Sequence, residues 1–290
     1  HGIIPPNYLR ECGEALSSPQ VSGLRPQVFP SGISPQPPGT TQLSPALSTF
    51  NFQPLTPSDT QVSGFSPQVF PFLVGGAWDC VGRGVVGKTI ALAVGSRFGI
   101  GNAAYRTSSA TEPAVLTDSV PFWVTRRDVF ERIGLFREDM LCHEDYELNH
   151  RLRRAGGQVI LLPWLRSTYF VRPTIRALCR QYGRYGFWKG RFIRSHPASL
   201  RARHLAPPAL LLSLVACPLW SLFSTLGLWS LSALLLLYGS FLLLASVVIA
   251  CAAIRDKTNH SSGKAKALPP CAPFLLPMIL ACLHFCWGAG

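Results

Sequence analysis

Three carboxylates stand close together near the start of a helix that the sequence predicts over residues 143–157: Glu144, Asp145 and Glu147. Acidic residues in the first turn and arginines in the last turn both interact favourably with the helix dipole. One apolar face is formed by residues spaced at i, i+4 and i+7: Leu148, Leu152 and Ala155. Gly156 and Gly157 predict a left-handed end of the helix. Packing would then hold the carboxylates in place, as a general base requires, although a solvated surface helix without chemistry would show the same pattern.

A second candidate for chemistry is the segment 82–89, Gly-Arg-Gly-Val-Val-Gly-Lys-Thr, which matches the phosphate-binding pattern G-x-x-x-x-G-K-[ST]. In that pattern, backbone amides surround the phosphates and Lys88 would contact the terminal phosphate. No apolar strand ending in aspartate follows, and no domain of the size of an NTPase surrounds the segment. We therefore favour glycines of a loop that leads into a helix, and keep nucleotide triphosphate binding as an alternative.

Two further segments could contact a substrate. Residues 98–106 are rich in glycine, which predicts either a flexible loop over a substrate or a plain turn. Residues 180–189 mix aromatic and cationic side chains, and this mixture suits a diphosphate and a sugar ring. The alternative for the second segment is an amphipathic helix that lies on a membrane surface.

Composition and charge narrow the class of protein. The chain has 290 residues, of which 48% are hydrophobic, and a formal net charge of +13. No Asp or Glu occurs between Leu148 and Arg255, and the basic stretch 166–203 is followed directly by a very apolar region. A basic flank of this kind favours the anionic cytoplasmic leaflet of a membrane. Nucleic-acid binding is not favoured, because no recognition module with aromatic and basic residues accompanies the charge. The nine cysteines show no C-x-x-C pair, which indicates a reduced cytosolic environment.

Apolar runs predict three membrane helices, at 206–225, 228–254 and 268–287. Basic residues precede the first span and lie between the second and third, whereas the loop between the first two spans has none. The positive-inside rule then places the remaining, non-membrane part of the chain on the cytoplasmic side of the cell (inner) membrane, as part of a multi-pass protein.

Strand and helix patterns alternate before the membrane region. Helices are predicted at 3–16, 85–96 and 126–133, and strands at 120–124 and 159–163. This alternation predicts an α/β layer with a largely parallel sheet. Residues 17–72 are rich in Pro, Ser and Gln and repeat the segment 20–30 at 61–71, which predicts a low-complexity insertion without a core.

Several motifs resemble family 2 glycosyltransferases when they are taken in order. They are Arg-Arg-Asp-Val-Phe-Glu-Arg-Ile-Gly-Leu-Phe (126–136), Glu144-Asp145, Glu-Leu-Asn-x-Arg-Leu-Arg-x-Ala-Gly-Gly (147–157) and Gln181-x-x-Arg184-Tyr185. The chain is most similar to the membrane-anchored branch that builds succinoglycan-type exopolysaccharides, with which it shares three more segments: 74–76, 98–106 and 181–189. The resemblance implies the C-terminal part of a GT-A, Rossmann-like α/β domain, followed by transmembrane helices.

The first residues are similar to the segment that follows the Asp-Gly-His form of the D-x-D motif in this branch. His1 would then be the third position of that motif, where the family holds a divalent metal, Mg or Mn. The resemblance implies that donor-binding strands precede His1, so the chain is expected to be a partial sequence that is inactive alone. Its parts would be a donor-side remnant (1–16), the insertion (17–72), an acceptor-side region (73–204) and a membrane domain (205–290).

The resemblance also implies roles for individual residues. Asp145 would be the general base in an inverting transfer from a nucleotide-sugar donor to a lipid-linked saccharide or polysaccharide acceptor. Glu144 would orient Asp145 or contact the acceptor. The remaining expected substrate-binding residues are Asn102, Gln181, Arg184, Tyr185 and Trp188. The alternatives are a non-catalytic membrane protein with a degenerate transferase domain and, less favoured, a P-loop nucleotide-binding protein.

Overall fold

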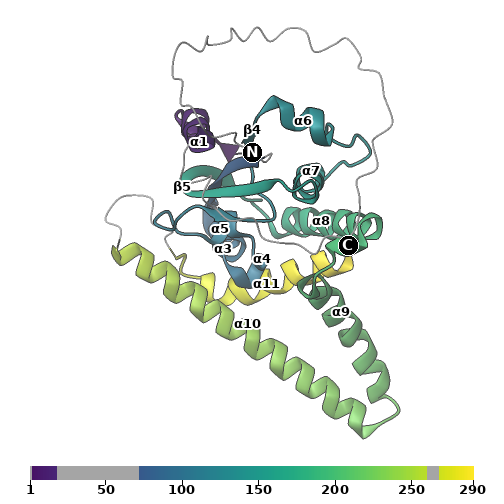
Figure 1. The fold of residues 1–290 in the computed structure, drawn as a ribbon. Coiled ribbons are helices and arrows are strands. Elements are labelled where there is room, and N and C mark those ends of the chain that lie inside the picture. Colours follow the sequence, from purple (N-terminus) through teal and green to yellow (C-terminus); the bar gives the residue numbers. More distant parts are fainter. Residues whose placement is uncertain (1, 18–71, 260–267) are drawn as a thin grey trace, which may run out of the picture.

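The computed structural model describes residues 2–17, 72–259 and 268–290. A mixed α/β domain with a small sheet lies above three long apolar helices (Figure 1). The insertion predicted at 17–72 and the expected metal ligand His1 therefore lie almost entirely outside the described residues.

The sheet has the strand order β1-β5-β2-β4, and β3 also pairs with β5. The strands are β1 (Gly2–Ile3), β2 (Phe72–Val81), β3 (Val115–Leu116), β4 (Val124–Thr125) and β5 (Gln158–Phe170). Only β2 and β5 run parallel, and every other described pairing is antiparallel. The prediction of a largely parallel sheet is therefore wrong. A helix-containing crossover joins the two long strands and lets them run parallel, whereas the two-residue strands only complete the sheet around them.

The pairing of β2 with β5 shifts register after Gly76, which pairs with Leu162, while Ala77 pairs with Arg166. A Cβ atom at Gly76 would collide with the backbone carbonyl of Leu165, so only glycine fits beside this bulge. The Gly76 N–H group donates a hydrogen bond to the Tyr8 hydroxyl over 2.7 Å. Tyr8 is 1% exposed and fixes α1 against the sheet.

The other regular elements of the described residues are helices. They are α1 (Tyr8–Ser17), α3 (Gly84–Val94), α4 (Arg97–Ile100), α5 (Ala104–Thr107), α6 (Arg127–Ile133), α7 (Glu144–Arg154), α8 (Ile175–Ser195), the 3-10 helix η1 (Pro197–Ser199), α9 (Ala202–Ser221), α10 (Thr225–Asn259) and α11 (Ala272–Ala289). The helices predicted at 85–96, 126–133 and 143–157 are thus present with small changes at their ends.

Three sequence-based boundaries change. The first helix starts at Tyr8 instead of residue 3, because Gly2 and Ile3 pair with β5. The strand predicted at 120–124 shrinks to Val124–Thr125, since Phe122 has a positive φ of 46° that interrupts an extended chain. The strand predicted at 159–163 continues past the bulge to Phe170.

The segment that resembles a P-loop does not form one. β2 ends at Val81 and α3 begins at Gly84, so only two residues separate strand and helix, too few to wrap a phosphate. A Cβ atom at Gly82 would collide with the backbone of Gly87, so close packing explains the glycine at position 82. Lys88 is exposed on α3.

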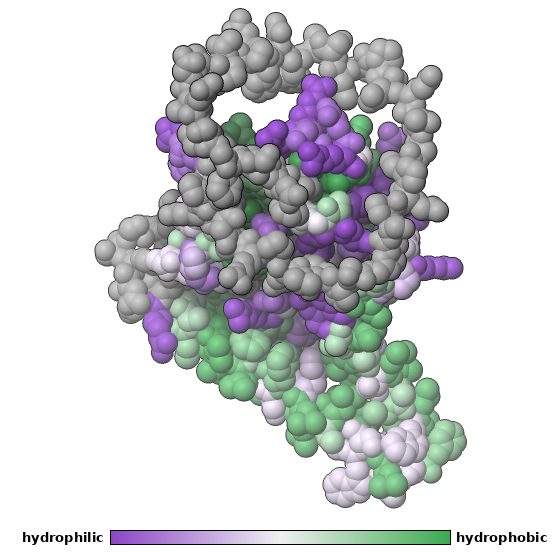
Figure 2. Space-filling view, in the orientation of Figure 1, coloured by the Kyte–Doolittle hydropathy of each residue, from purple (hydrophilic) through white to green (hydrophobic). Residues whose placement is uncertain are grey.

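Among the residues that the structure describes, three helices are long and apolar enough to cross a membrane: Ala202–Ser221, Thr225–Arg255 and Ala272–Ala289. In Figure 1, α9 and α10 form a hairpin that extends away from the α/β domain. The surface of this hairpin is largely hydrophobic, whereas hydrophilic residues gather over the domain (Figure 2). The turn between the two helices falls a few residues earlier than predicted. Gly227 packs so closely on the backbone of Trp220 and Ser221 that a Cβ atom would lie 2.5 Å from it.

The third apolar helix, α11, lies between the α/β domain and the hairpin (Figure 1). Its buried face packs against α3 and α8 through residues that are at most 1% exposed: Leu276, Ile279, Leu280 and Leu283. The His284 ring Nε2 lies 2.7 Å from the carbonyl oxygen of Phe98, which holds the glycine-rich turn on α11. Gly186 of α8 touches the backbone of Trp287. The domain and the apolar helices are therefore joined by direct packing.

The contact between α8 and α11 can be tested with a pair of glycines on one helix. A Cβ atom at Gly186 would collide with the Trp287 carbonyl oxygen, whereas nothing lies within 4 Å of a Cβ atom at Gly190. We expect Gly186→Ala to lower the free energy of unfolding by about 1–3 kcal/mol, since helices packed this closely must separate. Gly190→Ala should raise it by up to about 1 kcal/mol through helix propensity. Denaturant unfolding in detergent micelles measures both, and equal effects would contradict the packing.

Candidate active site

The start of α7 is fixed by a contact with α8. His143 is the N-cap residue and adopts a left-handed conformation with φ 64° and ψ 19°. Its ring Nε2 lies 3.1 Å from the backbone carbonyl oxygen of Tyr185. Because a carbonyl oxygen can only accept, Nε2 carries the proton. Burial lowers the pKa of His143 to about 4, so the ring is neutral near pH 7.

Glu147 is an anchor rather than a reactive group. It is fully buried, and the Arg151 Nε donates to its two carboxylate oxygens over 2.8 and 3.0 Å. The same guanidinium donates to the carbonyl oxygen of Ile133, the last residue of α6, and to that of Leu135 in the loop that follows. This network fixes the segment between α6 and α7, and it removes one of the three carboxylates from consideration as a base.

Asp145 is one of the two carboxylates that remain available for chemistry, and Glu144 is the other. Asp145 is half-buried, and its Oδ1 accepts a hydrogen bond of 2.7 Å from the Tyr146 N–H group. Burial raises the pKa of Asp145, while the backbone N–H groups of Tyr146 and of Asp145 itself oppose this rise. No cation of the described residues pairs with it within 4 Å. A carboxylate with a raised pKa is a stronger base than one in water.

Asp145 and Glu144 form one wall of an open cleft of about 510 Å³. Three aromatic side chains line the rest of it: Phe122, Trp123 and Phe136. The rings of Trp123 and Phe136 have their centroids 5.8 Å apart, at an interplanar angle of 27°. A flat apolar wall opposite two carboxylates suits a sugar ring, which has an apolar face and a rim of hydroxyl groups.

Sequence reasoning missed the aromatic wall. Phe122 and Trp123 lie inside the segment predicted as a strand, and Phe136 lies two residues after the glycine that ends α6. None of the three belongs to a periodic pattern. The signal in the sequence was the density of aromatic residues between positions 122 and 136.

The expected substrate-binding residues fall into different environments. Gln181 is 7% exposed, and its Nε2 donates to the hydroxyls of Tyr169 and Tyr185 over 3.1 and 2.9 Å. Trp188 is buried in a cluster with Met140, Cys142 and Phe192, so it packs instead of lining the cleft. Arg184 and Asn102 are exposed. The structure thus brings Gln181 and Tyr185 together and links them to the start of α7 through His143.

A buried guanidinium lies behind this group. Arg106 is 7% exposed, and its Cζ lies 5.0 Å from the ring centroids of both Trp78 and Tyr169 and 5.6 Å from that of Tyr105. Trp78 and Tyr169 stack with centroids 4.2 Å apart. Since Tyr169 also accepts from Gln181, contacts run from the sheet to α8 and on to α7. Sequence reasoning singled out the segment 98–106 but not this arginine.

The residues that the structure describes do not supply a metal site. No group of three or more His, Cys, Asp or Glu side chains is placed to hold an ion among them. Glu144 and Asp145 offer two carboxylates, but Glu147 is paired with Arg151. The ligand expected from the resemblance, His1, lies outside the described residues.

Residues 105–282 match the family described as glycosyl transferase family group 2, and the match covers more than half of the chain. The chain therefore belongs to this family of glycosyltransferases.

A stretch of 158 residues is 27% identical to succinoglycan biosynthesis protein ExoA of Rhizobium meliloti (strain 1021). That stretch covers 53% of this chain and 47% of the relative, so the chain spans about half of the relative's length. No solved structure matches the chain.

The buried state of His143 predicts how stability depends on pH. The pKa of this ring is about 4 in the folded protein and about 6.5 in the unfolded chain, so the unfolded chain binds more protons between these values. Stability should therefore fall as pH drops from 7 to 4.5, with about 2 kcal/mol of the loss due to His143.

The variant His143→Asn keeps a residue that tolerates the left-handed conformation but removes the titration. Denaturant unfolding at pH 7 and 4.5 should show a smaller acid loss for this variant than for the wild type. Identical losses would contradict the burial of a neutral ring.

Proposed function

We propose that this chain supplies the acceptor side and the membrane anchor of a glycosyltransferase. The enzyme would move a sugar from a nucleotide-sugar donor to a lipid-linked saccharide or polysaccharide acceptor, with inversion at the anomeric carbon. The observation that carries the proposal is the position of Asp145. This carboxylate has a raised pKa, lies at the edge of an aromatic cleft and is held there from two sides.

Asp145 acts as the general base in this proposal. Its Oδ1 already accepts from the Tyr146 N–H group, which leaves Oδ2 to take the proton from an acceptor hydroxyl. The hydroxyl oxygen forms a bond to the anomeric carbon as the bond from that carbon to the diphosphate breaks. The nucleoside diphosphate leaves with the electron pair, and the proton stays on Asp145. Because a carboxylate is a modest base, positioning of the acceptor must supply much of the rate.

The cleft positions the acceptor. Trp123 and Phe136 offer flat surfaces to the apolar face of a sugar ring, and Glu144 lies beside Asp145 to accept from a neighbouring hydroxyl. Gln181 acts indirectly, because it donates hydrogen bonds that fix the hydroxyls of Tyr169 and Tyr185. We assign Arg184 and Asn102, which are both exposed, to contacts with the substrate.

The parts of the chain have separate tasks in this proposal. Residues 73–204 form the acceptor side, residues 205–290 form the membrane anchor, and residues 1–16 belong to the donor side. Donor-binding strands and the divalent metal would be held outside the described residues. Arg201 and Arg203 precede or begin the first apolar helix, and Arg255 lies near the end of the second. By the positive-inside rule, this charge supports a position of the cleft at the cytoplasmic face of the membrane.

We expect Asp145→Asn to lower kcat of sugar transfer by about 10²–10⁴-fold with little change in KM, because the amide cannot take up the proton. Asp139→Asn is the matched control, since Asp139 is an exposed carboxylate paired with Arg137 outside the cleft. The measurement is transfer of labelled sugar by the full-length protein in membranes. Unchanged transfer by Asp145→Asn would overturn the base assignment. No transfer by the wild type with any nucleotide sugar would favour the alternative of a degenerate, non-catalytic domain.

A further inference from the structure

A group of cations surrounds one carboxylate where the α/β domain meets the first apolar helix. Asp118 lies in the loop after β3 and accepts hydrogen bonds from the Nη2 atoms of Arg201 and Arg203 over 2.7 and 2.8 Å. The Nη1 atom of Arg153, from α7, lies 3.4 Å from the same carboxylate. Lys189 of α8 is the fourth cation, and its ammonium group interacts electrostatically with the other four members. We call these five residues the Asp118 cluster.

The charges of the Asp118 cluster do not balance. The three guanidinium groups lower the pKa of Asp118 although burial alone would raise it, so this carboxylate is ionised. Within the part of the chain that the structure describes, no other carboxylate lies within 4 Å of any of the four cations. Burial, together with the charge of Arg203, lowers the pKa of Lys189 to about 7. The cluster therefore carries an excess of positive charge that the described residues do not neutralise.

Two donors in the cluster also lack a suitable acceptor. The Nε atom of Arg153 is buried and has no hydrogen-bond partner. Lys189 is 6% exposed, and its Nζ atom lies 3.4 Å from the ring centroid of Tyr146, without a carboxylate at ion-pair distance. Buried donors normally find an acceptor, and each exception needs an explanation. These two donors add to the excess of positive charge, which an anion with several acceptor oxygens would offset, and arginine pairs especially well with phosphate.

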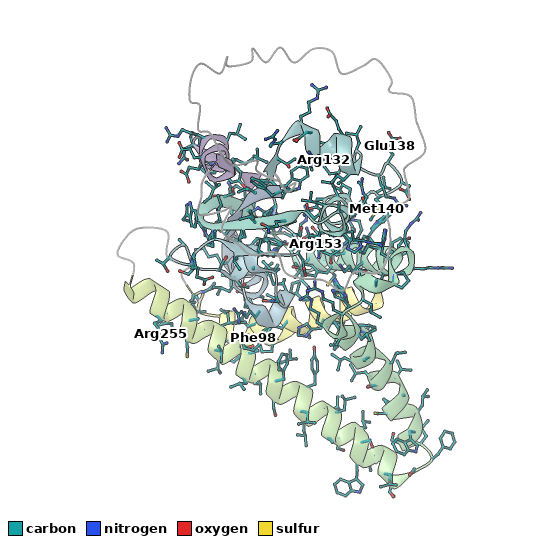
Figure 3. The ribbon with its side chains drawn as sticks, viewed as in Figure 1. Phe98, Arg132, Glu138, Met140, Arg153 and Arg255 are labelled. Carbon is teal, nitrogen blue, oxygen red and sulfur yellow. The ribbon has the colours of Figure 1, made fainter. Side chains whose placement is uncertain are left out.

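The position of the cluster indicates the source of that phosphate. Arg201 and Arg203 flank the first residue of α9, and Leu205, two residues after Arg203, is 51% exposed. Only 6% of the apolar window of α9 is buried inside the protein, so the helix is suited to lipid from its first turns. In Figure 3, Arg153 lies below α7, on the side of the apolar helices. The cluster is therefore at the level where the hydrocarbon region would begin and lipid headgroups would lie.

We propose that the Asp118 cluster binds the headgroup phosphate of an anionic phospholipid and so fixes the start of α9 at the membrane surface. The phosphate oxygens would accept from the remaining donors of Arg201 and Arg203, whose side chains are 40% and 39% exposed, while the buried Arg153 and Lys189 add positive charge to the site. Asp118 orients the arginines and competes with the ligand for their charge. The site is independent of sugar transfer, because it requires only that α9 lies in a membrane.

The test is native mass spectrometry of the full chain in uncharged detergent micelles, titrated with phosphatidylglycerol, with phosphatidylcholine or with inorganic phosphate. We expect tighter binding of phosphatidylglycerol than of the other two. Arg203→Gln and Lys189→Met should each weaken it by about fivefold, the effect of one basic residue near an anionic lipid. Arg203→Lys, which keeps the charge, should retain most of the binding. Asp118→Asn should tighten it, because the competing carboxylate is removed.

Arg176→Gln is the matched control, because Arg176 is exposed on α8 at about 20 Å along the helix from Lys189. It should leave the affinity for phosphatidylglycerol unchanged, and thermal unfolding of every variant verifies the fold. Equal binding of phosphatidylglycerol and phosphatidylcholine would overturn the proposal. An equal loss of binding in Arg176→Gln would also overturn it, as would saturation by inorganic phosphate without a preference between the lipids.

Discussion

The parallel pairing of β2 with β5, and its shift of register after Gly76, is the constraint on which the rest of the domain depends. Before the shift, both strands are buried on both faces and form the core of the sheet. After the shift, the two strands carry Trp78 and Tyr169 into a stack, and the guanidinium of Arg106 lies 5.0 Å from the centroid of each ring. A side chain at Gly76 would collide with the backbone of the bulge and separate the strands at this point. The aromatic stack therefore exists only because the strands can approach so closely.

Contacts transmit this geometry from the sheet to the proposed base. Tyr169 accepts from Gln181, Gln181 also holds Tyr185, and the backbone of Tyr185 holds His143 at the start of α7. On the other side of α7, the buried pair of Glu147 and Arg151 fixes the preceding segment. Asp145 lies between these two supports. Its orientation is therefore a property of the whole domain rather than of the helix that carries it, in keeping with the need for a base to be held rigidly against its substrate.

The apolar helices are part of the same body and not a separate anchor. Helix α11 contributes core residues to the packing of α3 and α8 and holds the turn at Phe98 through His284. The segment that begins at Phe98 leads to Arg106. It therefore contacts the apolar helix α11 at one end and the aromatic stack of Trp78 and Tyr169 at the other. The loop with Asp118 makes a second connection, through the arginines that surround the start of α9. The apolar helices are therefore in direct contact with the α/β domain at two places, through Phe98 and through Asp118.

The sequence by itself determined the α/β class, the helix with the three carboxylates, the three apolar helices and the resemblance to family 2 glycosyltransferases. Each of these features depends on periodicity, on caps or on motifs among neighbouring residues, so a single stretch of sequence is enough to predict it. The tertiary structure showed that Glu147 is neutralised by Arg151, whereas Glu144 and Asp145 line the cleft. It also showed the mixed direction of the sheet, the aromatic wall, the packing role of Trp188 and the cations around Asp118. Each of these arises where segments far apart in the chain meet, and burial and charge at such a meeting point depend on all of the segments at once.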